Sequence, residues 1–586
     1  MKKLSTIYTL ISICCLTIHT ITTQTFTPKP IWFQTYEWAK SMGDTLVDGG
    51  KAIAVDASGN VYTTGFFEGT VDFDPDDIEV HNLTSDGSYD VFISKLDSEG
   101  NFIWAKRMGG MLADAGHSIA LDVSGNVYTT GYFTGIADFD PDEVGVFNLP
   151  STGDEDIFIS KLDTSGNFIW AKNMGGILDD HGNSITVDAS GNVYMTGFFQ
   201  DTADFDPDPV GIRNLFSAGS KDIFICKLDT SGNLEGAGKM GGLDGDIGKS
   251  IAIDDSGNIY TTGSFEGTAD FNPKAGVDNL DSNGGTDIFI SKLDASGDFV
   301  GAGKIGGLGS DRGNSIALDT SGNIYITGSF EGTVDFDPKA GIYYLTSITD
   351  VYYVDTADIF ISKLDTSGNF VWAKSIGGIG KDAGFSITLD ASENVYTTGY
   401  FSEIVDFDPD GVETFDLPSE GLYDVFISKL DSLGTLKWAK SMGGSGNDNG
   451  FGIAVDASFN VYTTGYFNET VDFDPGTGID ILSSLGFSDI FVHMLSNDLL
   501  DIFHQNIISP TVVYPNPTTE NVTLDLGQQY NNVTLRVKFF SGELISTSDH
   551  KETDKLDFSI EGKAGVYLVE VFVDNEKIRT LKVIKQ

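Results

Sequence analysis

Short runs of alternating apolar and polar residues dominate the chain, and their order repeats. In one copy the runs are "HSIALD" (His117–Asp122), "VYTTGYF" (Val127–Phe133), "DIFISKLD" (Asp156–Asp163) and "FIWAKNM" (Phe168–Met174). Alternation with a period of two, together with many β-branched and aromatic residues, predicts strands. The turns "VSGN" and "TSGN" separate the first from the second strand and the third from the fourth. Each copy therefore predicts four strands, with a long connection between the second and the third.

The repeat occurs seven times. The Asp at the end of the first strand marks each copy, and neighbouring copies lie 65 to 71 residues apart: Asp56, Asp122, Asp188, Asp254, Asp319, Asp390 and Asp456. Tandem units of this kind bury their faces against one another. Seven units of four strands predict an all-β, seven-bladed β-propeller, with a β-solenoid as the alternative. Propeller blades usually have ~40–45 residues, so the excess predicts a loop insertion between the second and third strands.

The two ends of the repeat region complement each other. The segment "YEWAKSMG" (Tyr36–Gly43) precedes the first copy and matches a fourth strand. The last copy ends with "DIFVHML" (Asp489–Leu495) and lacks a fourth strand of the "WAK" type. We therefore predict that the N-terminal segment completes the last blade, which closes the ring over residues 32–497 and removes exposed strand edges.

The repeat resembles the SBBP family of bacterial β-propeller repeats. The resemblance rests on "SIAVDASGNVYTTG"-type segments followed by "DIFISKLDxSGNFIWAK", and it covers roughly Ile31 to Leu495. Two kinds of departure occur. Glu393 and Phe459 replace the turn glycine in two copies, and Gly236 and Gly301 replace the tryptophan of the fourth strand in two others. The resemblance implies a fold more than a function.

The composition changes after Ser496. A linker over residues 498–512 precedes strand-like runs in residues 513–586, which predict a small antiparallel β-sandwich. The elements Tyr514-Pro515-Asn516-Pro517, Ser541-Gly542 and Gly565-Val566-Tyr567, with the terminal "KVIKQ", resemble the type A C-terminal sorting domain of the type IX secretion system. The resemblance implies that the type IX machinery exports the protein across an outer membrane, and that the protein is released or attached to the cell surface. The alternative is an ordinary terminal β-domain.

The first 23 residues have the pattern of a secretory signal peptide. Two lysines precede an apolar run and then small polar residues, which places cleavage near Thr23/Gln24. A lipoprotein signal needs a small residue before the cysteine, and Ile13 stands before Cys14. The mature chain would keep only Cys226 and so no internal disulfide. No later run is apolar enough to span a membrane. We expect a monomer that is extracellular or attached to the outer cell surface.

The charge of the chain restricts its partners. Among 586 residues, 86 are acidic and 35 are lysine or arginine, which gives a formal net charge of −51. This field repels nucleic acid and anionic membranes and attracts divalent cations.

An acidic motif follows the second strand in each copy and begins at Asp72, Asp138, Asp204, Asp270, Asp335, Asp406 and Asp472. Carboxylates at alternate positions suit calcium, which takes 6–8 oxygen ligands. The candidate calcium ligands are Asp72, Asp74, Asp76, Asp138, Asp140, Asp142, Asp204, Asp206, Asp208, Asp406, Asp408 and Asp410. Lys274 and Lys339 replace the third carboxylate in two copies and argue against a cation there. An EF-hand is excluded, because Leu417 stands where that loop needs Glu. In the alternative, structural interpretation, Phe73 and its equivalents anchor the loop in the core and the carboxylates cap free N–H groups.

Two further repeated features have a structural and a functional interpretation. An Asp-x-Gly motif precedes each first strand, at Asp48, Asp114, Asp180, Asp246, Asp311, Asp382 and Asp448. It predicts links between blades, and the alternative is a ring of carboxylates around the central channel. Tryptophan recurs at one position of the fourth strand, at Trp38, Trp104, Trp170, Trp372 and Trp438. We predict that it packs between blades, and the alternative is a platform for sugars.

No catalytic motif is recognisable. HExxH and GxSxG are absent, the six mature histidines are scattered, and the ring holds three arginines, Arg107, Arg213 and Arg312. We therefore predict a non-catalytic binding, scaffold or adhesion module for glycans, peptides or surface proteins, with no certain cofactor apart from the calcium considered above. The alternative is a hydrolase or lyase of extracellular polysaccharides with carboxylates at the channel mouth. A cluster of unlike residues that breaks the seven-fold pattern would favour the enzyme, and the irregular insertion Tyr343–Phe360 is the first place to look.

Overall fold

The computed structural model separates residues 34–497 from the C-terminal part of the chain, and each is a compact unit. The residues described are 31–76, 79–142, 144–348, 356–411, 414–476, 478–500, 512–514, 518, 521–539, 544–560, 562–563, 565–573 and 576–585. The predicted signal peptide, most of the predicted linker, Pro515–Pro517 and Ser541–Gly542 lie outside these ranges, as do residues 349–355 of the irregular insertion. Among the described residues, no helix has the length and apolar character needed to cross a membrane.

Each copy of the repeat forms a four-stranded antiparallel sheet, as expected of propeller blades. In the second copy the strands are β8 (Ala115–Leu121), β9 (Val127–Asp138), β10 (Asn148–Leu162) and β11 (Phe168–Gly176), and each pairs with the next along the chain. The preceding sheet contains β2 (Gly49–Val55), β3 (Val61–Phe67), β6 (Asp90–Leu96) and β7 (Phe102–Gly110). The next contains β12 (His181–Val187), β13 (Val193–Asp204), β14 (Asn214–Leu228) and β15 (Leu234–Gly242).

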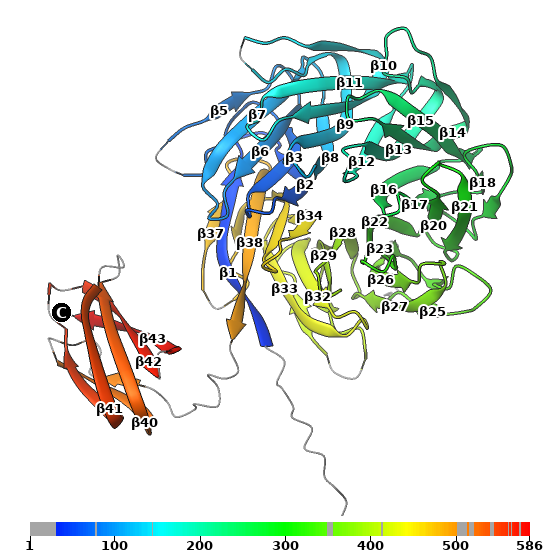
Figure 1. The fold of residues 1–586 in the computed structure, drawn as a ribbon. Helices are drawn as coiled ribbons and strands as arrows, with labels where there is room; N and C mark the ends of the chain where they lie inside the picture. The colour runs from blue at the N-terminus through cyan, green and yellow to red at the C-terminus, as the bar shows by residue number, and fades with distance from the viewer. Residues whose placement is uncertain are drawn as a thin grey trace, which may run out of the picture. The chain divides into compact units, whose positions relative to one another are not determined.

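The remaining copies follow the same order around the ring, with the first strand of each sheet innermost (Figure 1). They are β16 (Ile247–Ile253), β17 (Ile259–Phe265), β20 (Asp287–Leu293) and β21 (Phe299–Ile305); β22 (Arg312–Leu318), β23 (Ile324–Phe330), β26 (Asp358–Leu364) and β27 (Phe370–Ile376); and β28 (Ala383–Leu389), β29 (Val395–Phe401), β32 (Asp424–Leu430) and β33 (Leu436–Gly444).

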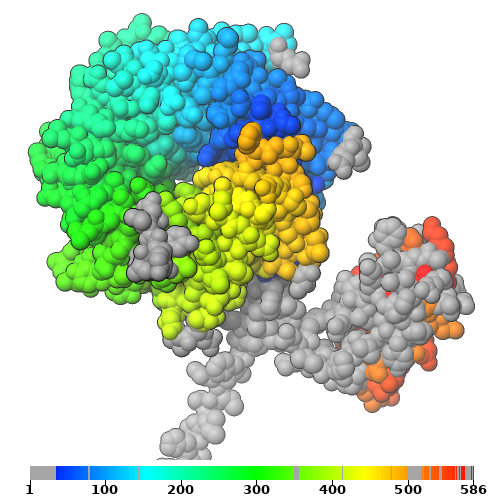
Figure 2. All heavy atoms as spheres, turned by 180° about the vertical axis from the view of Figure 1, so that it is seen from behind, coloured from blue at the N-terminus to red at the C-terminus, as the bar shows by residue number. Residues whose placement is uncertain are grey.

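The last sheet joins both ends of the ring. Its order is β1-β38-β35-β34, so that β1 (Ile31–Met42) lies beside β38 (Asp489–Leu500). The other two strands are β34 (Asn449–Val455) and β35 (Val461–Phe467). The innermost strands contact their neighbours all the way round, and β34 contacts β2. Figure 2 shows the end of the ring, in orange, directly against its dark-blue beginning.

The connection between the second and third strands is not only a loop. It contains a short antiparallel ladder in every sheet. In the first sheet this ladder is formed by two separate strands, β4 (Thr70–Asp72) and β5 (Asn82–Thr84). In the second and third sheets the same ladder is formed by the end of β9 with the start of β10 and by the end of β13 with the start of β14. The equivalent strands are β18 (Thr268–Asp270), β19 (Asn279–Asp281), β24 (Thr333–Asp335), β25 (Tyr344–Thr346), β30 (Ile404–Asp406), β31 (Asp416–Pro418), β36 (Thr470–Asp472) and β37 (Ile481–Ser483). The loop prediction was wrong here, because three alternating residues are too few to be recognised as a strand.

The ladder also connects neighbouring sheets. Gly109 of β7 pairs with Asp138 of the following sheet, and Gly175 of β11 pairs with Asp204. The same pairing recurs as Gly241 with Asp270, Gly306 with Asp335, Gly377 with Asp406 and Gly443 with Asp472. Backbone hydrogen bonds thus continue from the fourth strand of one sheet to the insertion of the next.

The hydrophobic core lies between adjacent sheets. One cluster combines Tyr62 and Val91 of the first sheet with Phe133 and Phe158 of the second. The phenylalanine of each acidic motif belongs to this core. Phe139 is fully buried, and its ring meets Phe133 edge-on with 5.3 Å between centroids. The predicted anchoring of the motif by its aromatic residue is therefore confirmed.

Two turns have another residue where the repeat has glycine, and their backbone is strained. The turn glycines have positive φ angles, such as 82° at Gly59. Glu393 and Phe459 occupy the same position with φ angles of 62° and 65°. Side chains other than glycine rarely adopt this conformation, so both turns are strained.

The C-terminal unit is a single curled sheet, where the sequence predicts a sandwich. Its strands are β39 (Val512–Tyr514), β40 (Asn521–Phe539), β41 (Leu544–Ser559), β42 (Gly565–Val573) and β43 (Glu576–Lys585), in the order β39-β40-β42-β43 with β41 also on β40. The long strands β40 and β41 stay paired on both sides of a break in register between Asp525 and Tyr530. The continuous pair of β40 and β41 therefore bends around the core. The described residues of this unit form no second sheet.

Candidate functional site: an axial cluster of cationic and aromatic residues

The aspartate of the Asp-x-Gly motif is buried and joins neighbouring sheets through hydrogen bonds. Asp114 accepts a hydrogen bond from the Gly110 N–H at 2.7 Å and another from the Thr134 N–H at 2.9 Å. It therefore joins the preceding fourth strand to the following second strand, and burial raises its pKa to about 7. All seven aspartates are fully buried, and each accepts two equivalent N–H bonds. These contacts confirm the predicted link between blades.

A second set of buried aspartates was missed in the sequence. Each is the first residue of the "DIFISKL"-type run of the third strand: Asp90, Asp156, Asp222, Asp287, Asp358, Asp424 and Asp489. Asp156 accepts a bond from the Thr152 N–H at 2.8 Å, and burial raises its pKa to about 6. The signal was visible, because the run "DIFISKL" starts with Asp in a position that faces the core.

The candidate calcium ligands bind backbone N–H groups of their own loops. Asp138 accepts from the Asp140 N–H at 3.1 Å and the Phe147 N–H at 2.7 Å, and Asp140 accepts from the Asp142 N–H. The third carboxylate pairs with a lysine of the preceding sheet, as Asp142 does with Lys106 at 3.3 Å. Asp76 and Asp410 make the same pair with Lys40 and Lys374. The described residues contain no group of three or more His, Cys, Asp or Glu placed to hold a metal ion, and calcium binding stays a prediction.

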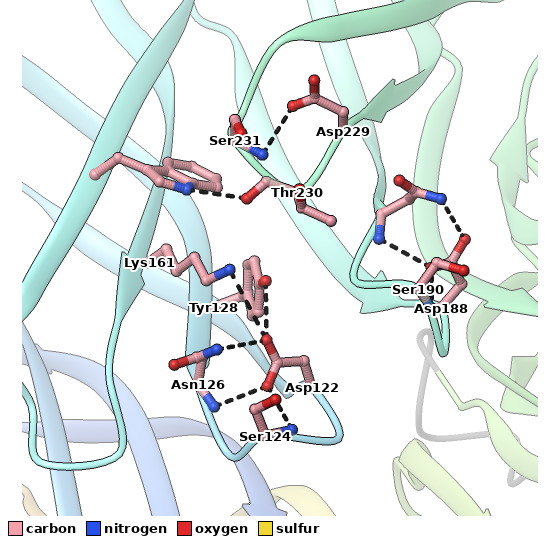
Figure 3. Close-up of polar contacts among 12 residues, drawn as sticks. Asp122, Ser124, Asn126, Tyr128, Lys161, Asp188, Ser190, Asp229, Thr230 and Ser231 are labelled. Carbon is pink, nitrogen blue, oxygen red and sulfur yellow. Dashed lines mark hydrogen bonds and ion pairs between the residues drawn. The ribbon is translucent and has the colours of Figure 1, made fainter.

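The turn aspartates have a local role. Asp122 accepts hydrogen bonds from Ser124, Asn126 and the Tyr128 hydroxyl, and the Lys161 ammonium lies 3.8 Å away (Figure 3). Burial would raise the pKa of Asp122, but the hydrogen bonds of Asn126 and Ser124 outweigh burial and lower it. All of its neighbours belong to the same sheet, so this network shapes the turn and the tyrosine.

The seven-fold pattern breaks on the innermost strands. The third residue of each differs around the ring: Lys51, His117, Asn183, Lys249, Asn314, Phe385 and Phe451. The first residue also varies and includes His181 and Arg312. These strands form the inner wall of the ring (Figure 1). Unlike residues at one register of near-identical repeats are the signal that could have revealed this site, and the sequence analysis missed it.

Positive charges converge on this wall from different sheets. Burial, followed by the charge of Lys249, lowers the pKa of Lys51 to about 8. Burial, followed by the charges of Arg312 and Lys221, lowers the pKa of Lys249. The Lys51 ammonium lies 3.8 Å from the centre of the Phe451 ring, a cation–π contact. Within the described residues, none of these four cations takes part in an ion pair.

Histidine and tyrosine stack beside the cations. The rings of Tyr132 and His181 are parallel with 4.5 Å between centroids, and His117 lies 5.7 Å from His181. Burial, followed by the charge of Lys221, lowers the pKa of His181 to about 4, and burial lowers that of His117 to about 3. The His181 Nε2 contacts the Glu155 carboxylate. Since the imidazole is neutral at pH 7, this contact is a hydrogen bond from the ring N–H and not an ion pair.

Aromatic rings complete the other side of the wall. Phe385 and Phe451 lie 4.9 Å apart, and Tyr400 and Tyr423 lie 4.7 Å apart. We use the name axial cluster for the following residues: Lys51, His117, Tyr132, Glu155, His181, Lys221, Lys249, Arg312, Phe385, Phe451. The irregular insertion does not contribute to it within the described residues, where Tyr343 packs on Phe370.

Comparison with known families identifies both parts of the chain. Residues 512–586 match the secretion system C-terminal sorting domain. Residues 238–264 and 303–329 match the SBBP β-propeller repeat. A sorting domain of this class implies secretion through the type IX system.

Two curated proteins match part of the chain. An "Uncharacterized WD repeat-containing protein L264" of Acanthamoeba polyphaga mimivirus is 27% identical over 506 residues, which cover 74% of this chain. The "Regulatory protein FlaEY" of Caulobacter vibrioides is 28% identical over 180 residues, 30% of this chain. The aligned regions cover 36% and 18% of these relatives. The chain thus carries SBBP β-propeller repeats and ends in a secretion system C-terminal sorting domain.

Proposed function

We propose that the protein is a non-catalytic binding module, exported by the type IX system through its C-terminal domain to the cell surface or medium. Its seven sheets form a seven-bladed propeller that β1 closes, and an anionic ligand binds at the axial cluster. One observation carries this proposal: four cations, none of them in an ion pair within the described residues, converge on the axis of a chain whose net charge is −51, and the cluster offers them only the Glu155 carboxylate, which Lys221 influences. Lys51, Lys221 and Lys249 are partly buried and Arg312 is exposed, and even partial burial of a charge is costly unless a counter-charge compensates it.

The residues around the cations narrow the class of ligand to acids that contain a ring. Aromatic faces surround the charges, since Lys51 lies over Phe451 and Lys221 lies 3.9 Å from the centre of the Phe198 ring. Flat hydrophobic surface beside ammonium and guanidinium groups suits a sugar ring that carries a carboxylate. We therefore propose an acidic oligosaccharide built from uronic acids. The long-range field of the protein repels such a ligand, so binding depends on direct contacts.

Substitution of Lys249 tests this site. Isothermal titration with galacturonate oligomers should show binding to the secreted chain, and Lys249→Gln should weaken it about 10- to 100-fold, because a charge-assisted bond contributes about 1.5–3 kcal/mol. Lys437→Gln is the matched control. It removes the same charge from a side chain that is 44% exposed and pairs with Asp431. Equal losses in both variants, or binding of neutral dextran oligomers as well, would contradict the proposal.

The affinity should also depend on pH through Lys51. Its pKa of about 8 means that the ammonium is charged at pH 7 and mostly neutral at pH 9. A carboxylate ligand prefers the charged form, so affinity falls from pH 7 to pH 9. Lys51→Gln should bind more weakly at pH 7 and lose most of this dependence. An unchanged pH profile would remove Lys51 from the site.

A polysaccharide lyase is the second candidate, and the Glu155–His181–Tyr132 group favours it. A neutral imidazole held by a carboxylate is suited to act as a general base, and nearby cations would stabilise the charge that develops on a uronate. Absorbance of an unsaturated uronate product would reveal turnover. Glu155→Gln should then abolish turnover and retain binding of the oligomer, whereas a binding module would release no product from the unmodified chain.

A further inference from the structure

A tryptophan of the fourth strand fills the space beside the next sheet in most of the ring. The indole N–H of Trp104 donates to the Thr164 carbonyl of the next sheet at 3.3 Å. Trp38, Trp170 and Trp372 make the same bond to Ser98, Thr230 and Ser432. The indole also covers the turn glycine, since a Cβ placed on Gly166 would lie 3.1 Å from the Trp104 ring. The predicted packing role of these tryptophans is confirmed by these contacts.

Two consecutive sheets lack this tryptophan. Gly236 of β15 and Gly301 of β21 stand in its place, and a Cβ built on either glycine meets no atom within 4 Å. The space remains open as two pockets. The pocket at Gly236 has a volume of about 560 Å³ and the pocket at Gly301 about 420 Å³. Both exceed the cavity of about 150 Å³ that is known to hold a benzene ring.

The lysines beneath the two pockets are uncovered. In four other sheets the lysine opposite the tryptophan in the ladder is buried, with 8% exposure at Lys95 and 6% at Lys429. Lys227 and Lys292 stand opposite the two glycines and are only partly buried. Each still lies over a tyrosine ring, at 5.3 Å from Tyr194 and 4.8 Å from Tyr260. The partners that normally hold an indole are therefore present while the indole itself is missing.

The walls favour a flat aromatic ligand with one donor group. Ile225, Leu234 and Leu293 line the first pocket, and the Ala295 carbonyl occupies the place of the indole acceptor Thr164. Ile290, Ile324 and Leu364 line the second, with Thr366 at the acceptor position. No aromatic side chain lines either pocket, so a sugar ring finds no face to stack on. An indole, by contrast, would meet the same lysine stem, apolar wall and carbonyl that hold Trp104.

We propose that these two pockets bind indole-type side chains, foremost tryptophan, that a partner protein presents. The partner's side chain fills the space that a tryptophan of the chain itself fills at the other sheets. The two sites are adjacent, because β15, β20 and β21 belong to consecutive sheets around the ring (Figure 1). A partner with two exposed aromatic residues could occupy both.

Titration of the full chain with indole and with N-acetyltryptophanamide tests the proposal. We expect two equivalents of 5-fluoroindole by ¹⁹F NMR. Gly236→Trp and Gly301→Trp should each remove one equivalent, and the double variant should remove both. N-methylindole should bind more weakly, since it cannot donate to the carbonyl. Gly245→Trp is the matched control, because its Cβ also meets no atom within 4 Å and lies outside both pockets. It should keep two sites.

A gain of binding gives an independent readout. Trp170→Gly should open a third pocket and raise the stoichiometry to three, and a melting curve would verify that this variant folds. Saturable binding that persists in the Gly236→Trp/Gly301→Trp double variant, or no binding at millimolar indole, would overturn the proposal. N-acetyltryptophanamide binding more than tenfold weaker than indole would exclude a side chain on a peptide. Competition by a neutral maltooligosaccharide would assign the pockets to sugars instead.

Discussion

The melting temperature of the ring is expected to rise by on the order of 10 °C when the pH is lowered from 8 to 5. The cause is the set of fourteen buried aspartates at the starts of the first and third strands. Burial raises the pKa of the first-strand set to about 7, as in Asp48 and Asp382. In the third-strand set it raises the pKa to about 6 in Asp90 and to about 8 in Asp358. One side-chain oxygen of Asp156, Asp287 and Asp489 has no hydrogen-bond partner, which also favours protonation.

The sign follows from proton linkage. A carboxyl whose pKa is higher in the folded state than its usual value of about 3.9 binds protons on folding between these two values. The stabilisation is therefore complete below about pH 4, decreases as the pH rises from about 4 to the folded pKa values of about 6 to 8, and is lost above them. Below about pH 4 the turn aspartates reverse the trend, because hydrogen bonds lower the pKa of groups such as Asp56 and Asp163. The optimum should lie between about pH 4 and 5, where the two sets of aspartates oppose each other.

Calorimetric melting curves from pH 4 to 9 measure this effect, with two variants to separate its sources. Asp114→Asn should reduce the slope of melting temperature against pH, and should destabilise the ring more at pH 5 than at pH 8. Asp76→Asn removes an equal charge from a side chain that is 47% exposed and should leave the slope unchanged. Added salt screens surface repulsion and leaves the buried contribution. A slope that vanishes in salt would assign the effect to net charge alone.

Removal of β1 should have the second large effect. Without residues 31–43 the long strand β38 becomes an exposed edge, and the last sheet loses the buried Met42 and Ala39. The sheet also loses Trp38, whose indole donates to Ser98 of the first sheet at 3.1 Å. Trp38 is partly buried, so its loss costs less than the about 3–5 kcal/mol of a fully buried aromatic residue and adds to the loss of Met42 and Ala39. We expect a loss of at least about 5 kcal/mol, with aggregation through the open edge.

A circular permutation provides the control. Residues 36–43 can be joined after Leu495 through a turn of the Asp-Thr-Ser-Gly-Asn type that the other sheets use, so that Trp38 returns to the same place in the same sheet. The permuted ring should melt within a few degrees of the original, whereas the truncated ring should not. Equal stability of the truncated and original rings would show that β1 does not hold the ring closed.

Much of this protein can be predicted from its sequence, for a physical reason. Period-two alternation and glycine turns are local properties, and seven near-copies repeat the same evidence, so strands and sheet number follow from the chain itself. Anchoring by Phe73 and its equivalents was equally predictable, because an aromatic residue between aspartates has few other roles. The sandwich prediction for the C-terminal unit was wrong, since a bend in β40 and β41 depends on packing and not on the alternation of side chains.

The candidate sites required the tertiary structure. A repeat pattern directs attention to what recurs, such as the aspartate motifs, and these carboxylates are largely engaged with backbone N–H groups. The axial cluster consists of residues that differ from one repeat to the next. Lys51, Lys249 and Arg312 are far apart in the chain, and only the ring brings their charges together. The pockets at Gly236 and Gly301 were visible in the sequence as missing tryptophans. Only the structure, which places the lysine of the same sheet and the turn carbonyl of the next sheet beside the gap, shows that the vacated space can receive another ring. The sequence by itself determined the local strands and the order of the repeats, because neighbouring residues specify them. Closure and the convergence of distant side chains were decided by the tertiary structure, since they arise only when seven sheets pack around one axis.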